Sequence, residues 1–235
     1  MPNYVYGRLP SLNCLEAQTA KLIYIQRSFS DARILDMAKK NKTPIKYVEA
    51  TELNKMARGG NHQGVIVEVE EYKYSTLEEI ILSAKDKPQP LILILDGVED
   101  PHNFGAIIRS ADAFGVDGII IKNRNQVPVN MTVSKVSTGA INYVKIAQVS
   151  NLSNAITTLK ENGYWIYASD GSAKDSYSDV KYDGAICLIM GSEGEGISKL
   201  VLRNSDFIIK IPMSGHVNSL NVSVATGILL ARIRN

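Results

Sequence analysis

The sequence has few of the residues that bind metals or form disulfides. Its 235 residues include only two cysteines, Cys14 and Cys187, and three histidines. Two thiols so far apart fit neither a disulfide framework nor the ligand spacing of a zinc site. The histidines, His62, His102 and His216, stand singly. We therefore expect no metal site, and we expect the chain to work in a reducing, cytoplasmic environment.

Long apolar runs and a strong charge of either sign are also absent. No apolar run approaches the roughly 20 residues that cross a bilayer, and the first residues lack the basic-then-apolar pattern of a secretory signal. We therefore expect no membrane partner. The 26 Lys and Arg residues nearly balance the 24 Asp and Glu residues, and the net charge is +2. This balance neither requires nor excludes a nucleic-acid partner.

The chain does show two α/β passages joined by a polar stretch. Strand and helix patterns alternate over residues 1–70 and again over residues 77–235, whereas residues 71–76 are polar. Such alternation is typical of a sheet with helices packed on it. We therefore predict a small N-terminal α/β domain (1–70), a linker (71–76) and a larger α/β domain (77–235).

Apolar periodicity and turn signals place the individual elements. In the first passage they predict strands over 21–26, 44–48 and 64–69, and helices over 30–40 and 51–57. In the second they predict strands over 91–95, 118–121, 143–147, 165–168, 185–190 and 207–211, and helices over 76–84, 104–114, 132–137, 151–161, 197–202 and 220–232. The unbroken apolar run 91–95 indicates a strand buried on both faces, so we predict a doubly wound, mostly parallel sheet.

In such sheets ligands bind beyond the carboxyl ends of the strands, so the loops there are candidate sites. The loop after strand 91–95 leads into a helix that Asp100 is suited to begin, because proline is tolerated in the first turn. This segment carries the polar side chains of Asn103 and Arg109. Taken alone, Asn103 is typical of a turn or cap, and Arg109 of a surface residue paired with Asp112 or Asp100.

A glycine-rich loop, residues 191–197, follows the strand at 185–190. Its glycines indicate a backbone that approaches a ligand closely, although a plain tight turn explains them equally well. The sequence matches neither a P-loop nor the dinucleotide fingerprint. Glu193 and Glu195 place negative charge where those motifs hold phosphates. A nucleoside-type ligand without phosphates therefore fits this loop better.

A third polar loop follows the strand at 207–211 and enters an apolar helix. Ser219, Asn221 and Ser223 stand at the entrance. Helix capping explains any one of them, but three polar groups together indicate a site. A fourth patch carries Lys122, Arg124 and, further on, Lys135. These side chains could follow a phosphate backbone, or they could belong to a solvated loop.

Read together, these segments resemble the SpoU (TrmH) family of RNA ribose 2′-O-methyltransferases, within the SPOUT superfamily. Residues 100–115, 190–197 and 211–225 resemble its three signatures in order, and 134–140 also fit. Residues 1–70 resemble, more loosely, the ribosomal-protein-like RNA-binding domain of members that act on ribosomal RNA. Within the family, the chain resembles most the bacterial enzymes that methylate a guanosine of 23S, large-subunit ribosomal RNA.

The resemblance implies a fold and partners that the spacing does not show. It implies a SPOUT domain whose C-terminal segment forms a trefoil knot, S-adenosylmethionine held bent in that knot, and a homodimer through the catalytic domain. It implies catalytic roles for Arg109, Asn103, Glu193, Ser219 and Asn221, some of them acting across the dimer interface. It also implies cofactor contacts at Gly191, Ile211, Met213 and Leu220. For the RNA we nominate Arg8, Lys122, Arg124 and Lys135.

Several alternatives stay open. Arg109 either accepts the proton of the ribose hydroxyl or holds a phosphate and stabilises charge, because free arginine is a poor base. The substrate could instead be tRNA, or the chain could be a catalytically silent RNA-binding assembly factor. An ordinary nucleotide-binding protein is a third reading. The sequence names neither the nucleotide that is modified nor the state of the RNA, naked or within an assembling particle.

Overall fold

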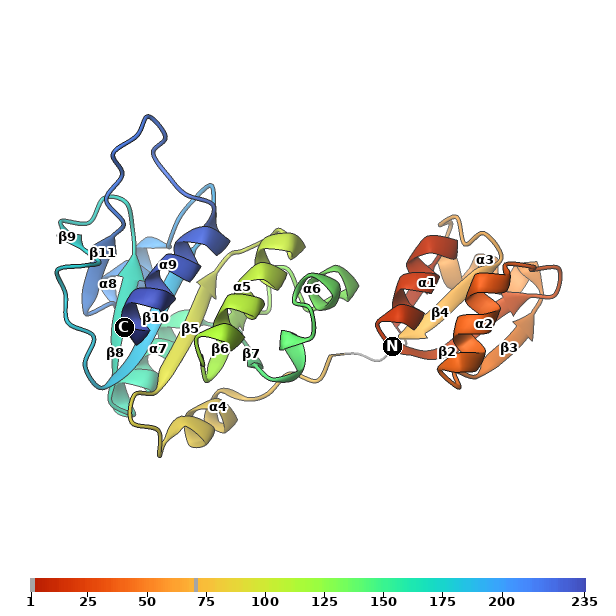
Figure 1. The fold of residues 1–235 in the computed structure, drawn as a ribbon, viewed down its shortest axis with the longest axis horizontal. Coiled ribbons are helices and arrows are strands. Elements are labelled where there is room, and N and C mark those ends of the chain that lie inside the picture. Colours follow the sequence, from red (N-terminus) through yellow and green to blue (C-terminus); the bar gives the residue numbers. More distant parts are fainter. Residues whose placement is uncertain (1–2, 70–71) are drawn as a thin grey trace. The chain divides into compact units, whose positions relative to one another are not determined.

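The chain forms two compact units, Met1–Lys73 and Tyr74–Asn235 (Figure 1). The structure is a computed structural model and describes residues 3–69 and 72–235. The division between the units falls inside the segment that we predicted as a linker. Residues 1, 2, 70 and 71, which belong to the predicted first domain and linker, lie outside the described residues.

Over residues 3–69, the N-terminal unit is a four-stranded sheet with three helices. Its strands run in the order β1-β4-β2-β3, in which β2 and β3 are parallel and β4 is antiparallel to both of its neighbours. The elements are β1 (Asn3–Tyr6), α1 (Arg8–Glu16), β2 (Ala20–Gln26), α2 (Ala32–Lys40), β3 (Ile45–Val48), α3 (Ala50–Ala57) and β4 (Val65–Val69). The three strands and two helices that we predicted here are all present.

Two elements of this unit escaped the sequence reading. Leu9 of helix α1 is exposed, so the helix lacks the regular apolar stripe by which most helices are predicted from sequence. The strand β1 is short and lies at the edge of the sheet, where only β4 pairs with it. Val48 and Ile66 of the sheet pack with Leu53 and Ala57 of α3 in one apolar cluster.

The second unit is a seven-stranded parallel sheet in the order β7-β6-β5-β10-β8-β11-β9. Its strands are β5 (Leu91–Asp96), β6 (Gly118–Lys122), β7 (Lys145–Val149), β8 (Tyr164–Ser169), β9 (Asp175–Ser176), β10 (Ala185–Gly191) and β11 (Phe207–Lys210). Its helices are α4 (Leu77–Ala84), α5 (Pro101–Ala113), α6 (Met131–Val136), η1 (Ala140–Asn142), α7 (Leu152–Glu161), α8 (Lys199–Arg203) and α9 (Val222–Arg234). The predicted parallel sheet is thereby confirmed.

The winding of this sheet reverses between β5 and β10. The chain runs outward from β5 to β6 and β7, then crosses to the other half of the sheet. Such a reversal leaves a crevice beyond the carboxyl ends of the two central strands. The ends of β5 and β10 therefore mark the place where a ligand is expected.

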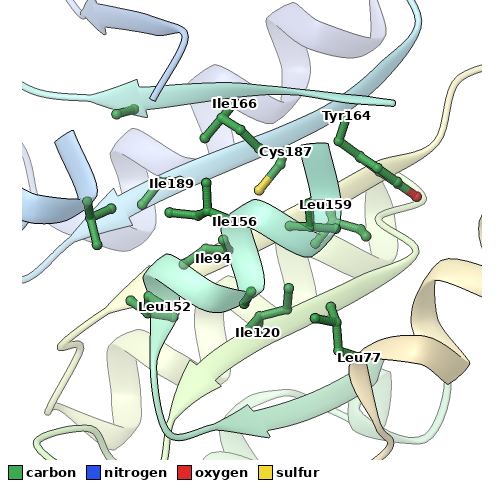
Figure 2. Packing of buried hydrophobic residues seen from close by; sticks show 14 of the residues in the cluster. Leu77, Ile94, Ile120, Leu152, Ile156, Leu159, Tyr164, Ile166, Cys187 and Ile189 are labelled. Carbon is green, nitrogen blue, oxygen red and sulfur yellow. The ribbon is translucent and has the colours of Figure 1, made fainter. Parts of the chain in front are cut away.

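The core of the second unit is built from the faces of strands that read as continuous apolar runs. All six residues of β5 are buried. On one face, Ile94, Cys187 and Ile189 pack under Ile156 and Leu159 of α7 (Figure 2). On the other side α5 packs against α6 and α9, and α9 also packs on β10. The covered faces explain why these strands show no polar alternation.

Small differences from the predicted elements have local causes. We predicted a strand at 143–147, but β7 begins at Lys145, because η1 occupies Ala140–Asn142 and Tyr143 is 80% exposed. The two-residue strand β9 is polar and exists only through its pairing with β11. In the described part of the chain, no helix is both long and apolar enough to cross a membrane.

Candidate active site

A cavity of about 710 Å³ opens at the reversal point between β5 and β10. We call it the switch-point cavity. Its walls are the segments that follow the two strands, 96–100 and 192–199, together with Asn103, Lys122, Asn125 and Val222. Five of these lining residues are acidic and two are lysines. The lining therefore suits hydrogen-bond donors better than a bare phosphate.

Three polar residues that lie far apart in the sequence meet at this cavity. The Nδ2 atom of Asn103 donates to Oε1 of Glu193 at 2.8 Å. The Nδ2 atom of Asn221 donates to the same Oε1 atom and to Oδ1 of Asn103, both at 2.9 Å. Asn103 is buried, whereas Glu193 and Asn221 are exposed. The result is a fixed polar network that presents a carboxylate to solvent.

Helix α5 positions Asn103 from its first turn. The Asp100 side chain caps the helix by accepting from the backbone N–H of His102 at 2.9 Å, and Pro101 occupies the first turn. Asn103 and Phe104 then face inward and are buried. Asp100 therefore begins the helix, as the sequence suggested, and α5 starts at Pro101, three residues before the predicted range 104–114.

The glycine-rich loop that carries Glu193 is shaped by its own backbone. Ser192 and Gly196 exchange two backbone hydrogen bonds of 3.1 Å, which close the loop at its base. A Cβ atom on Gly191 would lie 2.2 Å from the carbonyl carbon of Gly196 and 2.4 Å from the nitrogen of Ile197. Glycine at 191 is therefore required by the returning chain, a reason different from the ligand approach that we expected.

Asn221 both caps helix α9 and joins the network. Its Oδ1 atom accepts from the backbone N–H groups of Ser223, at 2.9 Å, and Val224, at 3.4 Å. Its Nδ2 atom makes the bonds to Asn103 and Glu193. The prediction that Asn221 caps a helix is thus correct, but the residue also takes part in the polar network.

A second cavity of about 610 Å³ lies beside the first. It is lined by the segments that follow β8, β10 and β11, and we call it the loop cavity. All four residues that we predicted to contact a cofactor line it: Gly191, Ile211, Met213 and Leu220. Ser219 lines it as well. Gly196 and Val222 line both cavities, so a ligand in one would lie next to a ligand in the other.

Arg109 stands apart from the other predicted catalytic residues. It lines neither cavity, and its side chain is exposed. It lies six residues after Asn103 on α5, which corresponds to about 240° around the helix and about 9 Å along it. Within the described residues no carboxylate lies within ion-pair distance, so neither Asp112 nor Asp100 pairs with it. Within one chain, Arg109 is not brought to the network.

The basic residues that we nominated for RNA lie in different surroundings. Arg8 begins α1, and its guanidinium carbon lies 5.4 Å from the centroid of the Phe29 ring. Lys122 lines the switch-point cavity, where its Nζ atom pairs with Oδ1 of Asp96 at 2.7 Å. Arg124 and Lys135 are exposed, and neither has an ion-pair partner in the described part of the chain.

Sequence reasoning missed Asp96, the last residue of β5. Its Oδ2 atom accepts from the backbone N–H of Ser198 at 2.9 Å, while Oδ1 holds Lys122. Burial works to raise the pKa of this carboxyl, but the hydrogen bonds with Lys122 and Ser198 outweigh burial and hold the pKa below its ordinary value. A charged residue that ends a buried apolar strand was the signal that could have revealed it.

The loop cavity fits a nucleoside cofactor, to judge by its size and its walls. Its volume lies within the range of about 300–1,000 Å³ that is usual for small-molecule sites. Met190, Ile211 and Leu220 supply apolar surface, and Gly171, Gly191 and Gly215 expose backbone groups. Among residues 3–69 and 72–235, no three His, Cys, Asp or Glu side chains gather as metal ligands.

The fold and the two adjoining cavities are typical of an α/β protein with room for a cofactor and a second ligand side by side. Comparison with known families agrees: residues 90–231 match the SpoU rRNA Methylase family. Residues 4–75 match the domain described as RNA 2′-O ribose methyltransferase substrate binding. The chain belongs to the SpoU rRNA methylase family, as the sequence resemblance predicted.

Individual relatives are consistent with this assignment. YacO of Bacillus subtilis (strain 168), provisionally named a TrmH family tRNA/rRNA methyltransferase, is 42% identical over 86% of this chain and 81% of its own length. An AdoMet-bound rRNA methyltransferase from Sinorhizobium meliloti has a TM-score of 0.66 at 26% identity, covering 98% of this chain and 86% of that one. A TrmH/SpoU tRNA modifying enzyme from A. aeolicus has a TM-score of 0.58 at 32% identity, covering 67% and 80%.

These matches fix the general activity. The chain is an RNA methyltransferase with an N-terminal substrate-binding domain and a SpoU methylase domain. Its cofactor is S-adenosylmethionine. The volume and lining of the loop cavity fit a group of this kind.

Proposed function

We propose that the chain transfers a methyl group to the ribose 2′-OH of a guanosine in large-subunit ribosomal RNA. The observation that carries this proposal is the network of Asn103, Glu193 and Asn221. Asn103 and Glu193 line the switch-point cavity, which shares Gly196 and Val222 with the loop cavity. A ribose in the first cavity would face a cofactor in the second. Holding two reactants in this way supplies much of the catalysis in such transfers.

The network suits the handling of a hydroxyl group. S-adenosylmethionine, when bound, supplies an electrophilic methyl group. A ribose hydroxyl is a weak nucleophile, so a neighbouring group must accept or polarise its proton. Glu193 uses Oε1 for the two amides, and Oε2 has no hydrogen-bond partner among the described residues. In the proposed function Oε2 accepts a hydrogen bond from the substrate, and the two amides fix its direction.

Arg109 enters this scheme through a second copy of the chain. It is exposed, has no ion-pair partner in the described residues and lies away from its own network. These facts support a homodimer in which Arg109 of one protomer reaches the site of the other, where it binds a phosphate and stabilises charge. The proposal includes a trefoil knot in the C-terminal segment, which membership of the SpoU family supports.

The match over the whole chain favours ribosomal RNA over tRNA. The rRNA methyltransferase from Sinorhizobium meliloti covers 98% of the chain, whereas the tRNA modifying enzyme from A. aeolicus covers 67%. A separate substrate-binding domain therefore accompanies the rRNA activity in this comparison. Methylation of tRNA is the second candidate, because the name of YacO includes both substrates.

The test uses methyl-labelled S-adenosylmethionine with unmodified large-subunit ribosomal RNA and, in parallel, tRNA. The RNA is digested to nucleosides, and the labelled nucleoside is identified by mass spectrometry. We expect labelled 2′-O-methylguanosine from ribosomal RNA alone. Label in tRNA alone would overturn the substrate, and label on another nucleoside would overturn guanosine. No label in naked RNA or in assembling ribosomal particles would indicate a silent binding protein.

A further inference from the structure

Three aspartates of the second unit share one arrangement. In each, one carboxylate oxygen pairs with a lysine ammonium group and the other accepts a backbone N–H from a neighbouring segment. We call these arrangements aspartate clamps. They are Asp96 with Lys122 and the Ser198 N–H, Asp117 with Lys87 and the Leu91 N–H, and Asp206 with Lys160 and the Ile166 N–H.

Only one of the three clamps lies at the cavities. Asp117 precedes β6 and Asp206 precedes β11, so both lie at the amino ends of their strands. Asp96 is the last residue of β5 and lines the switch-point cavity. Two aspartate clamps therefore lie away from the cavities, and one lies at the switch-point cavity.

The Asp96 clamp holds both ends of the glycine-rich loop. Asp96 lies opposite Gly191 in the pairing of β5 with β10, so it is fixed beside the start of the loop. Its Oδ2 atom holds the N–H of Ser198, where the loop ends. Glu193 lies between these two points and reaches Asn103 and Asn221. The position of the Glu193 carboxylate thus depends on a loop that one buried carboxylate secures.

Lys122 completes the clamp from β6. Its side chain is 28% exposed, and its Nζ atom lies 2.7 Å from Oδ1 of the 3% exposed Asp96 side chain. A Cβ atom on Gly97 would lie 3.6 Å both from that Nζ atom and from Cβ of Ser192. The lysine ammonium therefore lies close to Gly97 at the start of the β5 loop, and it offsets the charge of a carboxylate that would otherwise be buried unpaired.

We propose that Asp96 and Lys122 form a positioning pair that fixes Glu193 for methyl transfer. The inference rests on the proposed function and deepens it: neither residue touches the reacting atoms, and both act through the glycine-rich loop. It also assigns Lys122 to the loop in place of the phosphate contact that the sequence suggested.

The test compares Asp96→Asn with Asp117→Asn and Asp206→Asn in the full-length protein. Each substitution breaks one clamp, so each lowers the thermal unfolding midpoint. We expect only Asp96→Asn to lower kcat, by about tenfold or more, because small misplacements near reacting groups are costly. Its Kd for S-adenosylmethionine and its KM for RNA stay within about twofold of the wild type. Equal losses of kcat in all three variants, measured where all are folded, overturn the proposal.

A second variant and a second measurement separate this proposal from the proposed function. Lys122→Met should lower kcat with little change in the RNA KM; a raised KM with unchanged kcat would instead make Lys122 an RNA contact. Hydrogen exchange of residues 192–198 should quicken in Asp96→Asn and not in the two control variants. This measurement needs no activity, so it decides whether the clamp holds the loop even if the wild type methylates neither RNA. Unchanged exchange overturns the clamp.

Discussion

The Asn221 side chain makes two kinds of hydrogen bond, and substitution can separate them. Its oxygen caps α9, and its Nδ2 atom donates to Asn103 and Glu193. Asn221→Ser keeps a capping oxygen but removes the donor, whereas Asn221→Ala removes both. Serine and asparagine cap about equally well, and loss of a cap costs about 0.5–2 kcal/mol. The two variants should therefore differ in stability and agree in catalysis.

The expected magnitudes follow from the same contacts. Hydrogen bonds to a charged group contribute about 1.5–3 kcal/mol. If the lost bond to Glu193 is needed in the transition state, kcat falls by about 10- to 150-fold in both variants. At about 1 kcal/mol, the lost cap lowers the melting temperature of Asn221→Ala by about 2–4 °C, with little change in Asn221→Ser.

The assay pairs methyl-transfer kinetics with thermal unfolding of each variant. The affinity for S-adenosylmethionine serves as the control, since Asn221 does not line the loop cavity. Wild-type kcat in Asn221→Ser would refute the reasoning, because the donor would then be dispensable. A loss confined to Asn221→Ala would assign the residue to capping alone.

Three further predictions test other parts of the protein. Arg109→Ala should abolish methyl transfer and leave the affinity for the cofactor nearly intact. If Arg109 and Asn221 act across a symmetric dimer, mixing Arg109→Ala subunits with Asn221→Ser subunits should restore about a quarter of the wild-type activity, because about half of the dimers are mixed and each of these has one intact site. No recovery on mixing would place both residues in the site of one chain. Gly191→Ala should weaken cofactor binding measured by calorimetry, because its Cβ atom would collide with the Gly196 backbone. Gly194→Ala is the control and should bind the cofactor normally, because Gly194 has open space where its Cβ atom would lie. Equal affinities of the two variants would contradict the steric argument. Burial raises the pKa of Cys14 to about 11, and burial raises the pKa of Cys187 as well; native protein at pH 8 should thus resist thiol reagents. The free energy of unfolding from urea titration should decline as pH rises from about 9 toward 11, where only the unfolded chain ionises its thiols, and unchanged stability across that range would argue against the shift.

The sequence predicted those features that depend on local patterns. The apolar run at 91–95 predicted a strand of a parallel sheet that is buried on both faces. The segments that follow the strands were predicted to carry the polar residues of a site, and several of these residues line the cavities. The network joining Asn103 and Asn221 depends on how α5 and α9 pack, which no local pattern encodes. The partners of Asp96 also depend on packing, because they lie on β6 and beyond β10; only its place at the end of a buried strand was visible in the sequence.

Arg109 and Gly191 show two other limits of reading residues singly. Helical spacing sets Arg109 on a different side of α5 from Asn103, although both belong to one signature. Gly191 was read as an opening for a ligand; it does line the loop cavity, but a Cβ atom there would meet Gly196 and Ile197 of its own loop. In both cases the residue was noticed, and only the geometry could show what it faces.

The network also bears on when the protein becomes active during synthesis. Asn103 and Asn221 are separated by 118 positions, and Glu193 lies 90 positions after Asn103. Contacts between such distant residues form late, after the loop-closure entropy has been overcome. A nascent chain can complete the parallel strands β5 to β7 early, but it holds no assembled reaction site until α9 has been made and packed. On the proposed mechanism, methylation therefore requires chains in which α9 has been made and packed.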